Sequence, residues 1–195
     1  MKRARLPITF DPEPLKRDLA AIRPEEWVPH FNQQYYEGDW SGVALRSIAG
    51  APLQLYPDPA AEGEWAPTPL LASCPAFADV LAAFECPQTS ARLLRLGAGA
   101  RIREHTDFNL GLDDGEIRIH VPITTNPQVE FRHDGELVEM REGEAWYLDL
   151  KLTHALANNG DSPRVHLVVD CVVNDWLRGQ LEAATLASSG QRPSS

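Results

Sequence analysis

The sequence predicts a mainly β domain, a sandwich or barrel, with short helices from its front part packed on it. After Ser90, short apolar runs recur and are separated by turn residues such as Asp134-Gly135, which is typical of successive strands. From Leu6 to Pro75 the chain is instead punctuated by prolines, which disfavour long helices and central strands. We therefore expect a helical and irregular front part followed by an all-β part.

Two short helices fit the front part. Apolar residues spaced by four and three positions predict one helix between Leu15 and Ile22. The same kind of spacing predicts a second helix between Phe77 and Phe84, and Pro75 just before it is a typical start signal.

The β part is expected to hold eight strands, near 91–96, 101–107, 116–124, 128–133, 136–141, 145–150, 152–157 and 164–173. The strand at 116–124 alternates most regularly: isoleucine and valine occupy one face, while Arg118 and His120 occupy the other. This polar face either meets water or lines the interior of a small barrel, where it can enclose one small ligand.

Composition narrows the class of protein. The 195 residues are 43% hydrophobic and 24% charged, as in a globular domain, and no apolar run reaches the length of a membrane span. The formal net charge of −10 disfavours binding to nucleic acid, because such binding depends on basic side chains that neutralise phosphates. We expect a cytoplasmic protein that binds neither nucleic acid nor a membrane; oligomeric state is left open.

Three residues are candidate metal ligands. In an extended chain His105 and Asp107 point to the same side, so an imidazole and a carboxylate can reach one point together. His154, in a short apolar run, is the candidate third ligand. A site with two histidines and one carboxylate suits Fe(II), since it leaves coordination positions open. The alternatives are a surface His–Asp pair and a buried core histidine.

Arg164 indicates an anion site. It opens the apolar strand at 164–169, where a buried guanidinium is costly unless a carboxylate pairs with it. No acidic residue occurs within 162–169, so the partner is either a distant segment or a ligand carboxylate bound through two hydrogen bonds. If the strand at 116–124 faces a barrel interior, Arg118 and His120 add two more anion-binding groups to the same pocket.

The ordered set of these residues resembles the aspartyl/asparaginyl β-hydroxylase family. The resemblance runs from about Leu93 to Trp176 and includes the segment from Ser162 to Asp170; weaker similarity lies within Trp27 to Ser47. It implies a double-stranded β-helix, that is, a jelly-roll or cupin-like fold. It also implies an enzyme that depends on Fe(II), 2-oxoglutarate and O2.

Carried over by position, the family pattern assigns roles to six residues. His105, Asp107 and His154 would be the catalytic iron ligands, and Arg164 would pair with the distal carboxylate of 2-oxoglutarate. His120 would contact the other carboxylate of this co-substrate. Arg118 would bind a carboxylate of the substrate.

The carboxylate at Asp107 is a departure from the vertebrate peptide-modifying members of the family, which lack it. Its presence makes the site resemble bacterial relatives that act on small molecules, some of which hydroxylate free amino acids such as proline. The resemblance therefore implies hydroxylation of a C–H bond in a free amino acid or small peptide, with conversion of 2-oxoglutarate to succinate. Ascorbate would be a supporting reductant.

Two other functions remain open at this stage. One is a non-catalytic cupin-like module that binds a small anion or a metal, because a fold alone does not establish a function. The other is a zinc hydrolase with the same three ligands, which would have no need of Arg164.

The domain organisation follows from the change in pattern. We expect one catalytic domain over 1–184, with support from 1–90 and the β-helix core at 91–176, followed by a disordered tail at 185–195.

His30 and His133 are expected at the surface, and His166 either beside Arg164 or in the core. Aromatic residues that either line the pocket or belong to the core are Trp40, Trp65, Trp146 and Tyr147; Lys151 has no predicted role.

Overall fold

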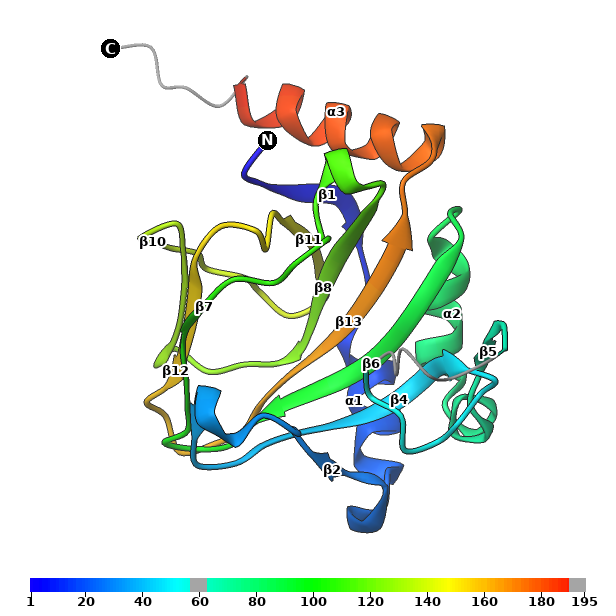
Figure 1. Ribbon diagram of the computed structural model, residues 1–195, viewed down its shortest axis with the longest axis vertical. Coiled ribbons are helices and arrows are strands. Elements are labelled where there is room, and N and C mark those ends of the chain that lie inside the picture. The colour runs from blue at the N-terminus through cyan, green and yellow to red at the C-terminus, as the bar shows by residue number, and fades with distance from the viewer. Residues whose placement is uncertain (57–62, 190–195) are drawn as a thin grey trace.

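The computed structural model describes residues 1–56 and 63–189, and they form two antiparallel sheets that face each other (Figure 1). The larger sheet has the strand order β1-β11-β8-β13-β6-β4-β2, with β5 beside β4. Its strands are β1 (Arg3–Thr9), β2 (Val28–Pro29), β4 (Trp40–Ile48), β5 (Trp65–Pro67), β6 (Gln88–Leu96), β8 (Glu116–Thr124), β11 (Glu144–Leu148) and β13 (Arg164–Val172).

The smaller sheet has the order β10-β9-β12-β7-β3. Its strands are β3 (Tyr36–Glu37), β7 (Arg101–His105), β9 (Val129–His133), β10 (Glu136–Leu137) and β12 (His154–Asn158). Short 3₁₀ turns connect some elements, at Pro24–Glu26, Gln33–Tyr35, Pro69–Ser73 and Leu112–Asp114. The arrangement confirms the prediction of a mainly β fold.

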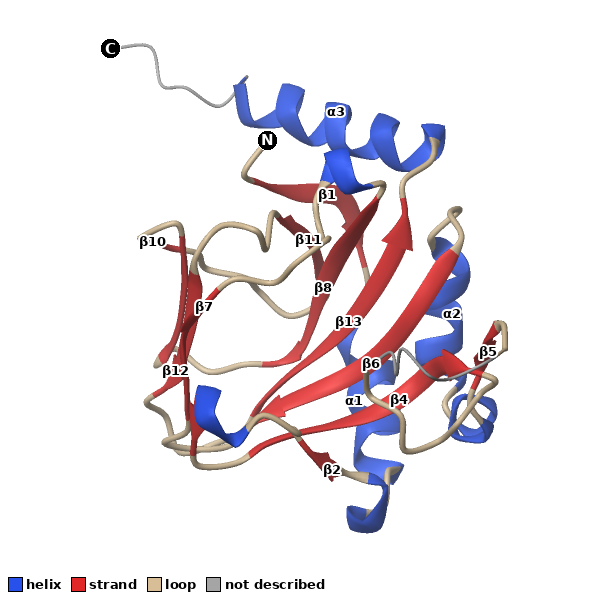
Figure 2. Ribbon diagram, viewed as in Figure 1, coloured by secondary structure: helices blue, strands red, loops and turns tan. Residues whose placement is uncertain are grey.

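Three helices lie on the outside of the larger sheet: α1 (Pro12–Ala21), α2 (Pro75–Ala83) and α3 (Asp175–Ser189) (Figure 2). The side chain of Asp11 accepts a hydrogen bond from the backbone N–H of Glu13, which caps α1, and α2 begins at the predicted Pro75. Both predicted short helices are confirmed. Within the described ranges, no helix combines the length and apolar character that a membrane span requires.

Strand β8 shows how the sheet separates core from site. Four side chains of one face are fully buried against the helices: Ile117, Ile119, Val121 and Ile123. Arg118 and His120 point the other way, toward the smaller sheet, where they line a cavity. The polar face of this strand therefore lines the interior of the barrel and does not meet solvent. Of the two alternatives that the sequence left open, the structure supports the ligand-enclosing interior.

A second apolar cluster fills part of the space between the sheets. Its buried members are Trp40, Leu96, Ala100, Ile102, Phe131, Val138, Met140, Leu148, Leu150 and Leu156. They come from both sheets, so their burial fixes the distance between the two layers. The cavity occupies the neighbouring part of the interior.

In the front part of the chain, one prediction is wrong, namely that it contains no central strand. Strand β4 is nine residues long and pairs with β6 inside the larger sheet, so the expectation that prolines disfavour central strands from Leu6 to Pro75 is wrong for this segment. The physical reason is visible in the sequence, because no proline occurs between Pro29 and Pro52. Strand β1 also joins the sheet, by pairing with β11.

The predicted tail needs a correction as well. Helix α3 extends to Ser189, so residues 185–189 are helical rather than disordered, and residues 190–195 lie outside the described residues. Leu177, Leu181 and Ala184 are buried on one side of this helix. Their spacing of four and three positions is typical of a helix, although no helix was predicted for this segment.

The predicted and observed strands differ mainly in where they end. The predicted strand at 101–107 ends at His105, and the one at 136–141 is only Glu136–Leu137. The hairpin at Asp134-Gly135 is confirmed, since both residues have positive φ angles, 52° and 75°, and connect β9 to β10.

The turn before β11 offers a test of the fold. Gly143 has a φ of 78°, and a Cβ atom there would overlap the carbonyl oxygen of Phe10. We expect Gly143→Ala to lower the free energy of unfolding by about 2 kcal/mol or more, through steric overlap added to backbone strain. Chemical unfolding followed by circular dichroism measures this loss.

Gly135 supplies the matched control, because its φ is 75° but no atom lies within 4 Å of a Cβ built there. Gly135→Ala should therefore cost only the strain of the left-handed backbone, about 1 kcal/mol. Equal losses in the two variants would contradict the proposed overlap at Phe10.

Candidate active site

The two sheets bring three candidate metal ligands together. His105 at the end of β7 is the register partner of His154 at the start of β12, and their ring centroids are 4.2 Å apart. Asp107 follows two residues later, where its backbone N–H donates to the carbonyl of Leu150 at 2.8 Å. One ligand atom from each of the three residues lies within 4.8 Å of the others.

Backbone carbonyls orient both imidazoles. Nδ1 of His105 lies 2.8 Å from the carbonyl oxygen of Arg103, and Nδ1 of His154 lies 3.1 Å from that of Leu152. A carbonyl only accepts, so each Nδ1 carries a proton, and Nε2 is the nitrogen that can offer a lone pair to a metal. Burial, with His105 nearby, lowers the pKa of His154 to about 4. The ring is therefore neutral near pH 7, as metal ligation requires.

The donor set fits a divalent transition metal. Two imidazole nitrogens and one carboxylate oxygen converge, and this donor set is typical of non-haem Fe(II) sites with open positions. The carbonyl contacts to both rings are the outer hydrogen bonds that such ligands usually have.

Arg164 and His120 line the same cavity, and each has buried nitrogen atoms without a hydrogen-bond partner among the described residues. Arg164 is 4% exposed, and within the described residues its only side-chain hydrogen bond joins Nη2 to Nδ1 of His166 at 2.7 Å, while Nε has none. Within the described part of the chain no carboxylate pairs with this guanidinium, and burial lowers its pKa to about 9. Both ring nitrogens of His120 are also buried and have no hydrogen-bond partner in the part of the chain that the structure describes. Such groups are costly unless a ligand satisfies them.

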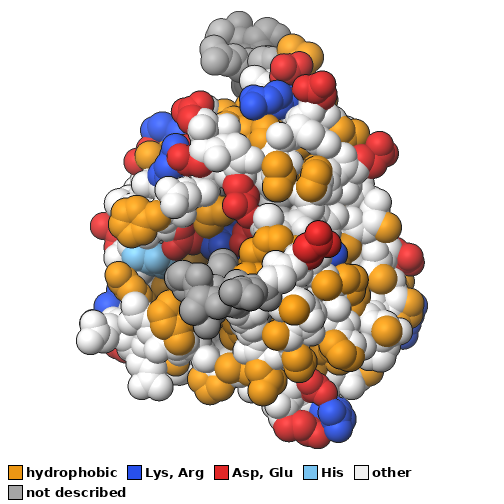
Figure 3. Space-filling view, turned by 45° about the vertical axis from the view of Figure 1, so that its right-hand side comes forward, with side chains coloured by type: hydrophobic (Ala, Val, Ile, Leu, Met, Phe, Trp, Pro, Cys, Tyr) orange, Lys and Arg blue, Asp and Glu red, His pale blue; other side chains and the backbone are white. Residues whose placement is uncertain are grey.

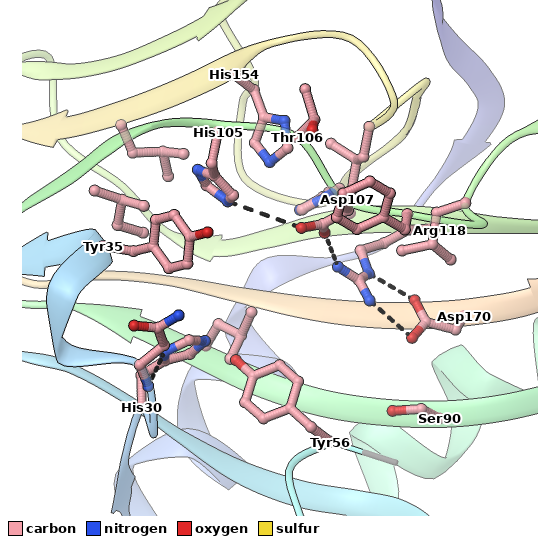
Figure 4. Close-up of a pocket in the computed structure, with 18 of the residues that line it drawn as sticks. His30, Tyr35, Tyr56, Ser90, His105, Thr106, Asp107, Arg118, His154 and Asp170 are labelled. Carbon is pink, nitrogen blue, oxygen red and sulfur yellow. Dashed lines mark hydrogen bonds and ion pairs between the residues drawn. The ribbon is translucent and has the colours of Figure 1, made fainter. Parts of the chain in front are cut away.

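Arg118 is held between two carboxylates (Figure 4). Its Nη1 donates to Asp107 Oδ2 at 2.6 Å, while Nε and Nη2 donate to the two oxygens of Asp170 at 2.6 and 3.0 Å. Asp107 Oδ1 faces His105 Nε2 at 3.9 Å, so Arg118 holds the oxygen of Asp107 that is turned away from this histidine. Burial alone would raise the pKa of Asp170, but Arg118 and Arg92 hold it below its usual value.

The cavity measures about 560 Å³ and opens to the surface beside the histidines (Figure 3). Aromatic residues form much of its wall: His30, Phe31, Tyr35, Trp40, Tyr56, Trp65 and Phe131. This size and mixed lining are typical of small-molecule sites.

Other residues singled out in the sequence are now placed. Trp40 and Trp65 line the cavity, whereas Tyr147 belongs to the helix-side core and Trp146 packs on the cluster between the sheets. His166 contacts Arg164, and Lys151 forms an ion pair with Asp114 at 2.9 Å.

The prediction that His30 and His133 lie at the surface is wrong. His30 is 7% exposed, because its ring stacks on Trp40 with centroids 3.5 Å apart. His133 is fully buried, and its Nε2 lies 2.8 Å from the carbonyl oxygen of Asp149.

Sequence reasoning missed Arg92, Asp170 and Tyr56. Arg92 is 1% exposed in β6 and could have been found by the reasoning used for Arg164, since it too lies in an apolar strand. Its partner Asp170, on β13, is 78 positions away in the sequence, and Tyr56 carries no local signal. The contact between Arg92 and Asp170 depends on the pairing of β6 with β13.

Fold and site together define a jelly-roll protein with a two-histidine, one-carboxylate cluster beside an anion pocket. The model of the aspartyl/asparaginyl beta-hydroxylase family matches residues 13–173, and the chain belongs to this family. The family resemblance stated from the sequence is thereby confirmed.

Two relatives agree with this family assignment, and a solved structure supports the fold. The chain is 29% identical over 171 residues to an L-proline cis-4-hydroxylase of Rhizobium meliloti (strain 1021), and 27% identical over 169 residues to L-proline cis-3-hydroxylase 1 of a Streptomyces species. Each match covers 84% of this chain but only 58% and 57% of the relatives. The structure of a Pseudomonas putida prolyl-4-hydroxylase aligns with this chain at 14% identity and a TM-score of 0.56. The alignment covers 88% of this chain and 92% of the hydroxylase chain, and it supports the predicted fold.

Proposed function

We propose that this protein is an Fe(II)- and 2-oxoglutarate-dependent dioxygenase that hydroxylates a C–H bond of a free amino acid or small peptide. One observation carries the proposal. The three convergent ligand groups lie in the same cavity as Arg164 Nε and both ring nitrogens of His120, which are buried without a hydrogen-bond partner among the described residues. A metal alone would leave those nitrogens unsatisfied, whereas a dicarboxylate co-substrate beside the metal satisfies them.

His105, Asp107 and His154 would hold the iron. Bound iron with 2-oxoglutarate and O2 supplies the oxidising chemistry, which yields succinate and carbon dioxide together with the hydroxylated product. The neutral state of His154 allows it to bind the metal without first losing a proton. Arg118 keeps the carboxylate of Asp107 in place through its second oxygen.

Arg164 would pair with the distal carboxylate of 2-oxoglutarate, and His120 would donate to the carboxylate next to the metal. His166 fixes the guanidinium by accepting a hydrogen bond from Nη2. Because Arg164 is nearly inaccessible to water, an ion pair with the ligand there gains more than one at the surface would.

The substrate would be a small molecule or peptide bearing a carboxylate, bound by Arg118. After its three bonds to Asp107 and Asp170, Arg118 keeps two of its five N–H groups for such a ligand. The aromatic wall around the cavity would exclude water from the substrate carbon. Because two relatives are named L-proline hydroxylases, free L-amino acids, proline first, are the first candidates. The expected cytoplasmic location stays a prediction.

Succinate formation tests the proposal. Protein supplied with Fe(II), 2-oxoglutarate, ascorbate and air should produce succinate in proportion to hydroxylated product when the right amino acid or short peptide is added. A panel of the twenty free L-amino acids and short peptides, analysed by mass spectrometry, measures both products. Reactions without the amino acid or without iron are the controls.

Two outcomes would favour the other functions. A protein that binds Fe(II) and 2-oxoglutarate but forms no succinate with any member of the panel would be a binding module. Tight zinc binding that 2-oxoglutarate does not affect, together with hydrolysis of a substrate, would indicate the hydrolase.

A further inference from the structure

Among the described residues, six have buried side-chain polar atoms without a hydrogen-bond partner. Two of them, His133 and Tyr147, do not line the cavity, and the other four form two sets around it. The first set, His120 and Arg164, is accounted for by 2-oxoglutarate in the proposed function. The second set consists of the hydroxyl of Tyr56 and two nitrogens of Arg92, Nε and Nη2. Because buried polar atoms normally have partners, the second set needs its own explanation.

Arg92 is a charged side chain beneath the cavity. On β6 its neighbours two positions away, Ser90 and Leu94, both line the cavity, so Arg92 points to the same side of the sheet. It is 1% exposed, and its Nη1 donates to Ser90 Oγ and, at 3.0 Å, to Asp170 Oδ2. The guanidinium carbon lies 5.1 Å from the centre of the Tyr56 ring, in a cation–π contact.

Asp170 therefore lies between two guanidinium groups. Without Arg92, one positive charge on Arg118 would face two negative charges, on Asp107 and Asp170. This trio would repel an anionic ligand. Arg92 brings the sum to zero, and a divalent metal at Asp107 makes it positive. With or without the metal, Arg92 makes the charge beside Arg118 one unit more positive, which favours binding of a carboxylate there.

Tyr56 presents a hydrogen-bond donor to the same region. Its side chain lines the cavity, and in the view of Figure 4 its ring lies below Arg118, on the opposite side from His105 and His154. Burial raises the pKa of Tyr56, so the hydroxyl keeps its proton near pH 7. A protonated, unpartnered hydroxyl in a buried place suits an anionic acceptor.

We propose that Tyr56 and Arg118 together bind the carboxylate of the amino-acid substrate, and that Arg92 is a positioning residue that neutralises Asp170 so that Arg118 can do so. The inference rests on the proposed function for the identity of the reaction. It adds a ligand contact at Tyr56 and a charge requirement at Arg92, and it predicts that the carboxylate, not its amide, is recognised.

The test compares four variants with the wild-type protein. They are Tyr56→Phe, which removes one oxygen atom, Arg92→Gln, Arg92→Lys, and the control Arg95→Gln. Arg95 lies on the same strand but contacts Ser41, Asp39 and Trp27, none of which belongs to the proposed site. Calorimetry on anaerobic protein loaded with Fe(II) and 2-oxoglutarate measures binding of each free L-amino acid, starting with L-proline, and of the amide of any that binds.

Tyr56→Phe and Arg92→Gln should each weaken binding of the amino acid by about 10-fold or more, as expected for a lost hydrogen bond or charge at a carboxylate. Arg92→Lys should restore most of the loss of Arg92→Gln, since it returns the charge. Binding of the amide, of 2-oxoglutarate and of Fe(II) should stay within about 2-fold of wild type in all four variants.

Circular dichroism measures whether each variant is folded. If Arg92→Gln does not fold, the comparison of Tyr56→Phe with wild type tests the proposal. Equal losses for amino acid and amide, or a wild-type protein that binds no free amino acid through its carboxylate, would overturn the inference. So would a loss of Fe(II) or 2-oxoglutarate binding that matches the loss of the amino acid. If wild type itself fails to bind 2-oxoglutarate, the proposed function fails instead.

Discussion

Replacing His154 by alanine is expected to weaken Fe(II) binding by at least about 100-fold and to abolish substrate-dependent succinate formation. His154 supplies one of only three donor atoms in the candidate cluster. The remaining pair, His105 and Asp107, lies on a single stretch of chain at the end of β7, so it offers no second point of attachment from another strand. Titration with Fe(II) under anaerobic conditions, together with metal content after dialysis, measures the loss.

His133 provides the control for this variant. It is the register partner of His154 on the neighbouring strand and is equally buried, but it is not part of the cluster. His133→Gln keeps a side-chain donor for the carbonyl of Asp149 and should leave metal affinity within about 2-fold of wild type. Unchanged iron affinity in His154→Ala, or an equal loss in both variants, would refute the assignment of His154.

Local patterns were enough to predict the strand at 116–124 and the faces of its side chains. The alternation from Ile117 to Ile123 survives in the structure because the helices cover one face of the sheet and the cavity lies against the other. His105, Asp107 and His154 could also be found, since metal-binding residue types are few. Their convergence depends on the register between β7 and β12, which no local pattern specifies.

The errors and omissions have a common cause. His30 and His133 carry no sequence feature that distinguishes them from surface histidines, and they are buried by partners brought from elsewhere in the chain. The pairing of Arg92 with Asp170, which neutralises a charge in the site, joins strands that are distant in sequence. Side chains whose role comes from a neighbouring strand are visible only once the sheet order is known.

Arg164→Met is expected to raise the KM for 2-oxoglutarate by about 100-fold while leaving Fe(II) affinity unchanged. The guanidinium is the only cation assigned to the distal carboxylate, and loss of a buried charge pair costs several kcal/mol, or two or more powers of ten in affinity. A 2-oxo acid without a distal carboxylate, such as 2-oxobutyrate, should bind wild type and variant equally weakly. Steady-state succinate or carbon dioxide release measures the difference.

Arg164→Met should weaken 2-oxoglutarate binding, but it should not lower the stability of the ligand-free protein. Without ligand, Arg164 is a buried cation whose guanidinium has, among the described residues, a single hydrogen-bond partner, the neutral ring of His166. Methionine removes this unpaired charge, so we expect the ligand-free variant to unfold at the same temperature as wild type or higher. Added 2-oxoglutarate should then stabilise wild type by about 2.7 kcal/mol at 100 times its Kd, and the variant scarcely at all. A variant that is less stable without ligand but equally stabilised by 2-oxoglutarate would show that Arg164 serves the fold and not the co-substrate.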